Sequence, residues 1–282
     1  MTALATVIGW IADPLAFGFM QRGLLSAVLV GTICALLSCY LVLKGWSLMG
    51  DAVSHAVLPG IVAAYVLKIP LAVGAFVAGL SCALATGYLK QNSRLKEDTV
   101  LGIVFSGMFA LGIVMYTKIE TDQHLDHILF GNMLGVQWPD VLEIAVIALP
   151  AILLILAKRK DLLLYCFDPA HARAIGLPVG LLHFGLLTLL ALTIVASLKA
   201  VGIILVIAML IAPGSIGFLL TKRFDTMLLI AVAAAIGSSV VGTILSFHID
   251  AATGPAIVVV QAGVFVLALL VKARAERVSP VA

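Results

Sequence analysis

The sequence contains a series of apolar runs, each about as long as the hydrocarbon core of a bilayer requires. A helix needs roughly 20 apolar residues to cross that core, and nine runs come close to this length. Hydrophobic residues make up 63% of the chain and charged residues 11%, whereas a soluble domain carries about 25% charged residues. The sequence therefore predicts an all-α polytopic membrane protein, a bundle of eight or nine transmembrane helices in a single domain over residues 1–282. The runs are 23–43, 51–67, 71–89, 99–117, 141–157, 181–198, 201–220, 227–247 and 255–271.

Two places leave the count of spans open between eight and nine. The first run can be placed differently within residues 1–43, and the short join around Lys199 need not be an outer loop. Residues 1–21 are only moderately apolar and are interrupted by Asp13 and Pro14. They predict an amphipathic segment lying at the membrane surface, and they lack the pattern of a cleaved signal peptide.

The positively charged residues predict the orientation of the chain. When successive spans alternate between the two sides, thirteen Lys and Arg residues fall on one side and four on the other. By the positive-inside rule the richer side is cytoplasmic. It carries the C-terminus, and the N-terminus is outside if there are nine spans. The thirteen are Lys44, Lys90, Arg94, Lys96, Lys158, Arg159, Lys160, Arg173, Lys222, Arg223, Lys272, Arg274 and Arg277, and the four are Arg22, Lys68, Lys118 and Lys199.

Several motifs of enzymes and of cysteine chemistry are absent. The chain has no P-loop, no H-E-x-x-H, no G-x-S-x-G and no EF-hand loop, so it is predicted neither to hydrolyse ATP nor to be an enzyme. Its cysteines form no C-x-x-C pair, and they are expected to be small buried hydrophobes. They are Cys34, Cys39, Cys82 and Cys166.

Asp51 and His55 are the most informative polar residues of the sequence. A carboxylate and an imidazole four residues apart lie on one face of a helix, and ionisable groups at membrane depth usually mark a substrate path. Together they offer two ligands for a divalent transition metal. Pro59 leaves the His55 carbonyl without its helical partner, and Gly50 and Gly60 would permit local unwinding. The alternative is that Asp51 starts a helix and His55 is a packing residue.

The internal connection over residues 158–179 predicts a short helix. Asp168 can cap it and Pro169 can occupy its first position, while Gly176 and Pro178 end it. Set crosswise between two spans on the cytoplasmic side, this helix is a candidate docking element. The alternative is an ordinary connecting helix.

The external connection over residues 118–140 is acidic. Its His and Asp residues could capture a cation at the outer mouth, although a solvated polar loop has the same composition. The candidate residues are Glu120, Asp122, His124, Asp126 and His127. Small residues also crowd several spans and predict close helix packing without chemistry of their own. Among them are Gly74, Gly79, Gly102, Gly107, Gly112, Gly237 and Gly242.

Four blocks of the sequence carry a resemblance to a known family. They are residues 45–60 (GWSLMGDAVSHAVLPG), 127–132 (HILFGN), 167–178 (FDPAHARAIGLP) and 201–213 (VGIILVIAMLIAP). With these blocks the chain closely resembles the permease subunits of manganese, zinc and iron ABC importers, the ABC-3 family, and most of all the manganese/iron permeases of enterobacterial type. The likeness extends from about residue 20 to residue 270, nearly the whole chain.

The resemblance implies specific roles. Asp51 and His55 would contact the metal within the membrane, and the segment 167–178 would be the coupling helix seated on a separate ATPase subunit. A second permease and an extracytoplasmic metal-binding protein would complete the importer in the bacterial inner membrane, with ATP bound only on the partner. The segment begins Asp168-Pro169, not with the Glu-Ala-Ala of many ABC importers. The coupling residues implied are Phe167, Asp168, Pro169, Ala170, Ala172, Gly176 and Pro178.

Three hypotheses follow for function. The first is the permease of an ATP-driven importer of Mn²⁺, or of Fe²⁺ or Zn²⁺, without a permanently bound cofactor. The second is a proton-coupled secondary metal transporter, which would need titratable relay groups in the spans and paired discontinuous helices. The third is a membrane scaffold, which would give no reason for Asp51 and His55. Association with an ATPase discriminates the first from the other two.

Overall fold

The part of the chain that the structure describes is built from helices. The computed structural model describes residue 10, residues 12–118 and residues 133–278, and no strand occurs among them. Nine stretches within these ranges are long and apolar enough to cross a membrane. The predicted all-α bundle is therefore confirmed, with nine candidate spans rather than eight.

Twelve helical elements make up these described ranges from residue 18 onward. The second span combines α3 and α4, and α11 contains the sixth and seventh spans. The short helices α9 and α10 lie in the connection between α8 and α11. The elements are α2 (Gly18–Lys44), α3 (Met49–Ala56), α4 (Leu58–Leu67), α5 (Leu71–Gln91), α6 (Glu97–Tyr116), the 3-10 turn η1 (Met133–Gly135), α8 (Trp138–Ala157), α9 (Arg159–Phe167), α10 (Pro169–Ala174), α11 (Val179–Leu220), α12 (Phe224–His248) and α13 (Thr253–Val278).

A kink interrupts α11 at the start of its second span. Gly202 has φ 77° and ψ 166°, values outside the helical region, which a residue with a side chain rarely adopts. The spans 179–198 and 200–220 therefore meet at a sharp change of direction, with no loop between them. This explains why the sequence around Lys199 contains so few polar residues.

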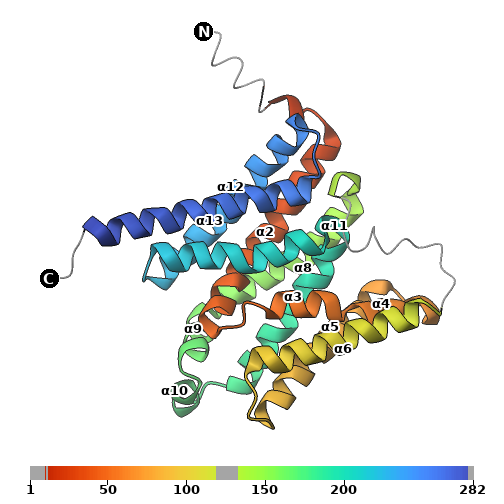
Figure 1. Cartoon of the computed structure of the whole chain (residues 1–282), viewed down its shortest axis with the longest axis vertical. Helices are drawn as coiled ribbons and strands as arrows, with labels where there is room; N and C mark the ends of the chain where they lie inside the picture. The colour runs from red at the N-terminus through yellow and green to blue at the C-terminus, as the bar shows by residue number, and fades with distance from the viewer. Residues whose placement is uncertain (1–9, 11, 119–132, 279–282) are drawn as a thin grey trace.

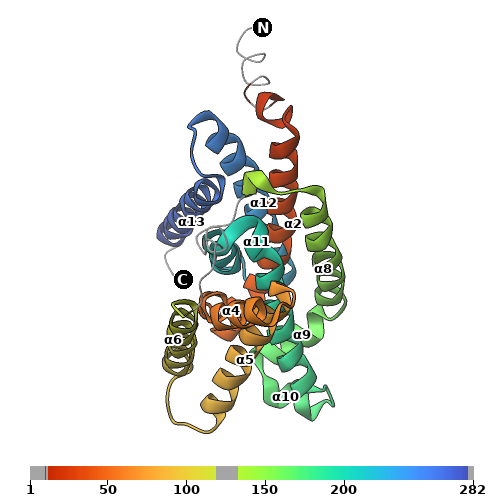
Figure 2. The ribbon, with the colours of Figure 1, turned by 90° about the vertical axis from the view of Figure 1, so that its right-hand side faces the viewer.

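The helix α2 lies at the centre of the bundle. It packs against α11, α12 and α8 and is the most buried of the described spans, whereas α6 is the least buried. Figure 1 shows α12 and α13 on one side of α2, and α3 to α6 grouped on the other. Figure 2 shows α6 and α8 at opposite edges of the molecule. The group α3–α6 is thus a subassembly that carries Asp51 and His55 at the edge of the core.

The first span begins earlier than the sequence predicted. The helix α2 starts at Gly18, so residues 18–21 belong to the span and not to the amphipathic segment predicted for residues 1–21. The physical reason is packing, because the Met20 side chain is buried in the bundle. Residues 1–9 and 11 lie outside the described ranges. The Trp10 ring stacks on His248 with a centroid separation of 3.9 Å, which places residue 10 beside the C-terminal end of α12.

Two glycines allow α4 and α5 to touch backbone to backbone. A Cβ added at Gly60 would collide with the Gly74 carbonyl oxygen, and one added at Gly74 would collide with the Gly60 carbonyl oxygen. Such close approach is the usual function of small residues between membrane helices. It holds α4, and with it the adjoining α3, against α5.

Replacing Gly60 by Ala should lower the stability of the protein. The new methyl group would meet the backbone of Gly74 and lie 2.6 Å from the Ala78 Cβ, and overpacking of this kind costs about 1–3 kcal/mol. The measurement is thermal unfolding of the purified protein in detergent. Gly102→Ala is the matched control, because a Cβ there meets nothing within 4 Å. Equal unfolding temperatures for the two variants would contradict the predicted contact.

Candidate metal site

Asp51 and His55 form the accessible face of a helix that is otherwise buried. The other six residues of α3 are all buried, whereas the side chains of Asp51 and His55 are 37% and 32% exposed. Their Oδ1 and Nε2 atoms lie 3.4 Å apart. The predicted sharing of one helical face by these two side chains is confirmed.

An aromatic wall from α6 holds the His55 imidazole. The Phe109 ring meets it edge to face at a centroid separation of 5.4 Å, and the Phe105 ring lies at 6.4 Å. The Nδ1 atom is buried and has no hydrogen-bond partner among the described residues. The ring is therefore fixed by packing, with its Nε2 on the side of Asp51. Neither phenylalanine was among the residues predicted from the sequence, although their spacing of four residues places them on one face of a helix.

The break in the second span occurs where Pro59 predicted it. The helix α3 ends at Ala56 and α4 begins at Leu58, with Val57 between them. Gly50 and Gly60, which would permit local unwinding, lie within α3 and α4 in this structure. They serve instead as contact points, because a Cβ at Gly50 would lie 2.8 Å from Leu210 Cδ1 and Gly60 touches Gly74.

Asp51 and His55 have no third potential metal ligand beside them among the described residues. Among the described residues, no group of three or more His, Cys, Asp or Glu side chains could hold a metal ion. Asp51 also lies in the first turn of α3, where the helix dipole favours a negative charge. A carboxylate oxygen and an imidazole nitrogen are suitable ligands for a divalent transition metal, so the pair is a candidate half site, to which further ligands would have to be added.

The thiols do not add ligands to this half site. All four cysteines are free and buried, as predicted. Cys166 lies outside the spans, in α9, and burial raises the pKa of its thiol to about 11. It is therefore protonated at neutral pH, and a metal would require the thiolate.

The internal connection contains the short helix that the sequence predicted. The Asp168 carboxylate accepts hydrogen bonds from the backbone N–H groups of Ala170 and His171, at 3.0 and 2.9 Å. Pro169 is the first residue of α10, and Gly176 ends the turn with φ 86°. The helix is preceded by a second one, α9 (Arg159–Phe167), which was not predicted from the sequence.

The predicted docking residues differ in their exposure. The Phe167 side chain is 67% exposed. Ile175, next to the helix end and not among the predicted residues, is 57% exposed. Ala172 is fully buried, so its side chain packs within the protein and is not accessible to a partner. The predicted outer-mouth residues Glu120, Asp122, His124, Asp126 and His127 lie outside the described ranges.

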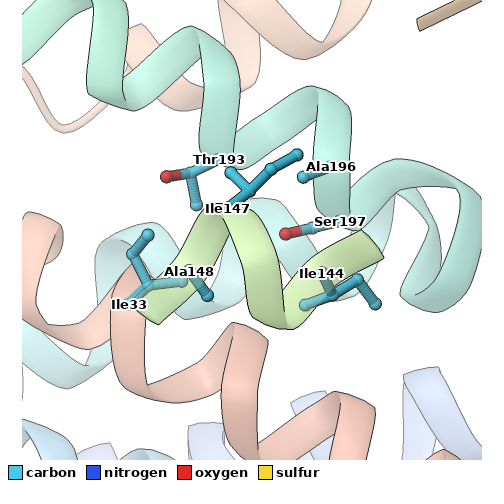
Figure 3. Close-up of a pocket in the computed structure, with 7 residues that line it drawn as sticks. All are labelled: Ile33, Ile144, Ile147, Ala148, Thr193, Ala196 and Ser197. Carbon is cyan, nitrogen blue, oxygen red and sulfur yellow. The ribbon is translucent and has the colours of Figure 1, made fainter. Parts of the chain in front are cut away.

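A narrow, partly open pocket between α2, α8 and α11 is not part of this site. Figure 3 shows the side chains that line it, drawn from these three helices. They include two hydroxyls but no carboxylate or imidazole, so the pocket offers no strong ligand for a metal. The lining residues are Ile33, Ile144, Ile147, Ala148, Thr193, Ala196 and Ser197.

Comparison with known proteins identifies the family. The chain matches the ABC 3 transport family over residues 16–272. It is 64% identical over 260 residues to the chelated iron transport system membrane protein YfeD of Yersinia pestis, covering 92% of this chain and 88% of that protein. It is 53% identical over 261 residues to the manganese transport system membrane protein MntB of Synechocystis sp., covering 93% and 85%.

A solved structure agrees with this match over the same length. The structure described as PsaBC from Streptococcus pneumoniae in complex with Fab superposes with a TM-score of 0.85 at 35% identity. The alignment covers 96% of this chain and 99% of that one. The bundle, its spans and its sequence blocks therefore agree in one assignment: this chain belongs to the ABC 3 transport family.

Proposed function

We propose that this chain is the permease subunit of an ATP-driven importer of divalent transition metals. Mn²⁺ is the principal cargo, with Fe²⁺ and Zn²⁺ as close alternatives. The observation that carries the proposal is the Asp51/His55 half site, the accessible face of an otherwise buried membrane helix. The names of relatives that transport manganese and chelated iron support this class of cargo.

A second permease completes the ligand set. Two Asp51/His55 faces, one from each permease, supply two carboxylates and two imidazoles, and water fills the remaining positions. Such a mixed oxygen and nitrogen set cannot discriminate strongly among Mn²⁺, Fe²⁺ and Zn²⁺, because intrinsic affinity follows the Irving–Williams order. Selectivity then depends on an extracytoplasmic binding protein and on the geometry of the site.

Energy comes from a separate ATP-binding subunit. The sequence has no P-loop, and the exposed Phe167 and Ile175 beside α10 provide an apolar contact for a partner. The protein is placed in the bacterial inner membrane with its C-terminus and α10 in the cytoplasm, in agreement with the excess of Lys and Arg on that side. Closure of the ATPase beneath α10 would open and close the path past Asp51.

The direct test is metal uptake by the reconstituted complex. The chain, its second permease and its ATP-binding subunit are placed in vesicles with the binding protein, and Mn²⁺ entry is followed with and without ATP. We expect entry to require ATP hydrolysis and to be independent of a proton gradient. Entry driven by a proton gradient without ATP would instead indicate a secondary transporter.

The acidic outer connection should affect capture and leave metal preference unchanged. Its carboxylates would attract a cation or a basic rim of the binding protein, but this attraction is screened beyond roughly 8 Å at physiological salt. Replacing Glu120, Asp122 and Asp126 together by Asn or Gln should raise the half-saturating concentration of loaded binding protein. A changed order of preference among Mn²⁺, Fe²⁺ and Zn²⁺ would mean that the selective site lies in this connection.

A further inference from the structure

A cluster of four side chains lies between the coupling segment and the start of α3. The Tyr165 hydroxyl, from α9, lies 2.7 Å from His183 Nδ1, near the start of α11. The Trp46 ring meets the His183 ring edge to face at 5.4 Å. The Lys44 ammonium lies 4.4 Å from the centroid of the Tyr165 ring. Tyr165 and Trp46 are both buried.

The hydrogen bond between Tyr165 and His183 closes a loop around the whole of α10. The two residues are 18 positions apart, and α10 with both of its connections lies between them. Within this loop Ala172 is buried, and its carbonyl accepts a hydrogen bond from the Leu177 N–H at 3.0 Å. These hydrogen bonds therefore connect three segments, which we expect to move as a unit: the end of α9, the whole of α10 and the start of α11.

Trp46 connects this unit to the helix that bears Asp51. It follows Gly45, whose φ of 75° ends α2, and its N–H donates to the Leu41 carbonyl at 2.8 Å. Its carbonyl in turn accepts from the N–H of Met49, the first residue of α3, at 3.0 Å. A displacement of the Trp46 side chain would therefore be passed through this hydrogen-bonded turn to α3, which begins two residues before Asp51.

We propose that Tyr165, His183 and Trp46 are positioning residues that transmit movement of α10 to the Asp51/His55 half site. The Tyr165–His183 hydrogen bond makes α10 and its flanking helices move together, and the His183 ring pushes on Trp46. This inference rests on the proposed function, in which α10 contacts the ATP-binding subunit. The indole N–H of Trp46 is buried without an acceptor among the described residues, so no hydrogen bond from it to these residues opposes a displacement of the ring.

The test is the amount of Mn²⁺ imported per ATP hydrolysed by the reconstituted complex. Tyr165→Phe removes only the hydroxyl and should lower this ratio about five-fold, the factor that loss of one hydrogen bond gives in a two-state equilibrium. Trp46→Leu should lower it at least as much, whereas Trp46→Phe keeps a ring against His183 and should restore most of it. Tyr88→Phe is the matched control, because the Tyr88 side chain on α5 is 68% exposed.

The ratio separates transmission from a merely structural role. If these residues only stabilised the fold, the variants would lower the amount of assembled complex. Metal import and ATP hydrolysis would then fall together, and their ratio would not change. An unchanged ratio in Tyr165→Phe and Trp46→Leu overturns the inference. If Trp46→Leu does not assemble, Tyr165→Phe decides alone. A failure of the proposed function would be seen separately, because the wild-type complex would then import no metal with ATP. That result would also overturn the inference.

Discussion

Asp51→Asn and His55→Ala should each abolish metal import while the protein still folds, inserts and binds its ATPase. Asn keeps the shape of Asp51 but loses the anionic oxygens, and Ala removes the imidazole nitrogen. Both side chains are about one-third exposed and contact each other, so the fold should tolerate both changes, although His55→Ala also removes the ring contacts with Phe105 and Phe109. Changes to residues that only support metal ligands already cost about 10–100-fold. We therefore expect uptake of Mn²⁺ to fall by more than about 100-fold.

Ser54→Ala is the control for this prediction. Ser54 lies between Asp51 and His55 in α3, but its side chain is buried and its hydroxyl donates to the Gly50 carbonyl at 2.7 Å. This variant should transport normally. The measurement is initial Mn²⁺ uptake by vesicles containing equal amounts of assembled complex. Near-normal uptake by both Asp51→Asn and His55→Ala would leave Asp51 as a helix-start residue and His55 as a packing residue.

The sequence predicted the features that depend on local chemistry. In lipid, the backbone N–H and C=O groups of a span must form their hydrogen bonds within that span, so apolar runs correspond closely to helices. The helix α2 begins five residues before the predicted run, because Met20 packs inside the bundle. The helix α10 could also be predicted, because Asp168, Pro169 and Gly176 act on the backbone next to them. The Asp51/His55 face follows from helical spacing alone.

Contacts between distant segments could not be predicted in this way. Nothing near Tyr165 in the sequence indicates that its hydroxyl meets His183, and nothing near His55 indicates the wall formed by Phe105 and Phe109. The glycines illustrate the same limit. Gly74 touches a neighbouring backbone, whereas Gly102 and Gly107 on α6 meet nothing within 4 Å, because small residues permit close approach but do not determine which face has a neighbour.

Gly176→Val should uncouple or detach the ATPase while leaving membrane insertion intact. Gly176 has φ 86°, a conformation that costs a residue with a side chain about 1–2 kcal/mol and is still less tolerated by a β-branched one. Relief of that strain would disturb the turn in which the Gly176 N–H donates to the Arg173 carbonyl at 3.1 Å. Since 1.4 kcal/mol is a factor of ten, we expect import to fall about ten-fold.

Gly180→Val separates backbone conformation from side-chain bulk in this prediction. A Cβ at either glycine meets nothing within 4 Å, but only Gly176 has a positive φ. The same valine should therefore be tolerated at Gly180, four residues further along, and disruptive at Gly176. The measurements are co-purification of the ATPase and metal-stimulated ATP hydrolysis. If both persist in Gly176→Val, then α10 does not couple ATP hydrolysis to transport. A coupling helix whose C-terminal end had changed conformation could not keep the same contacts with the ATPase.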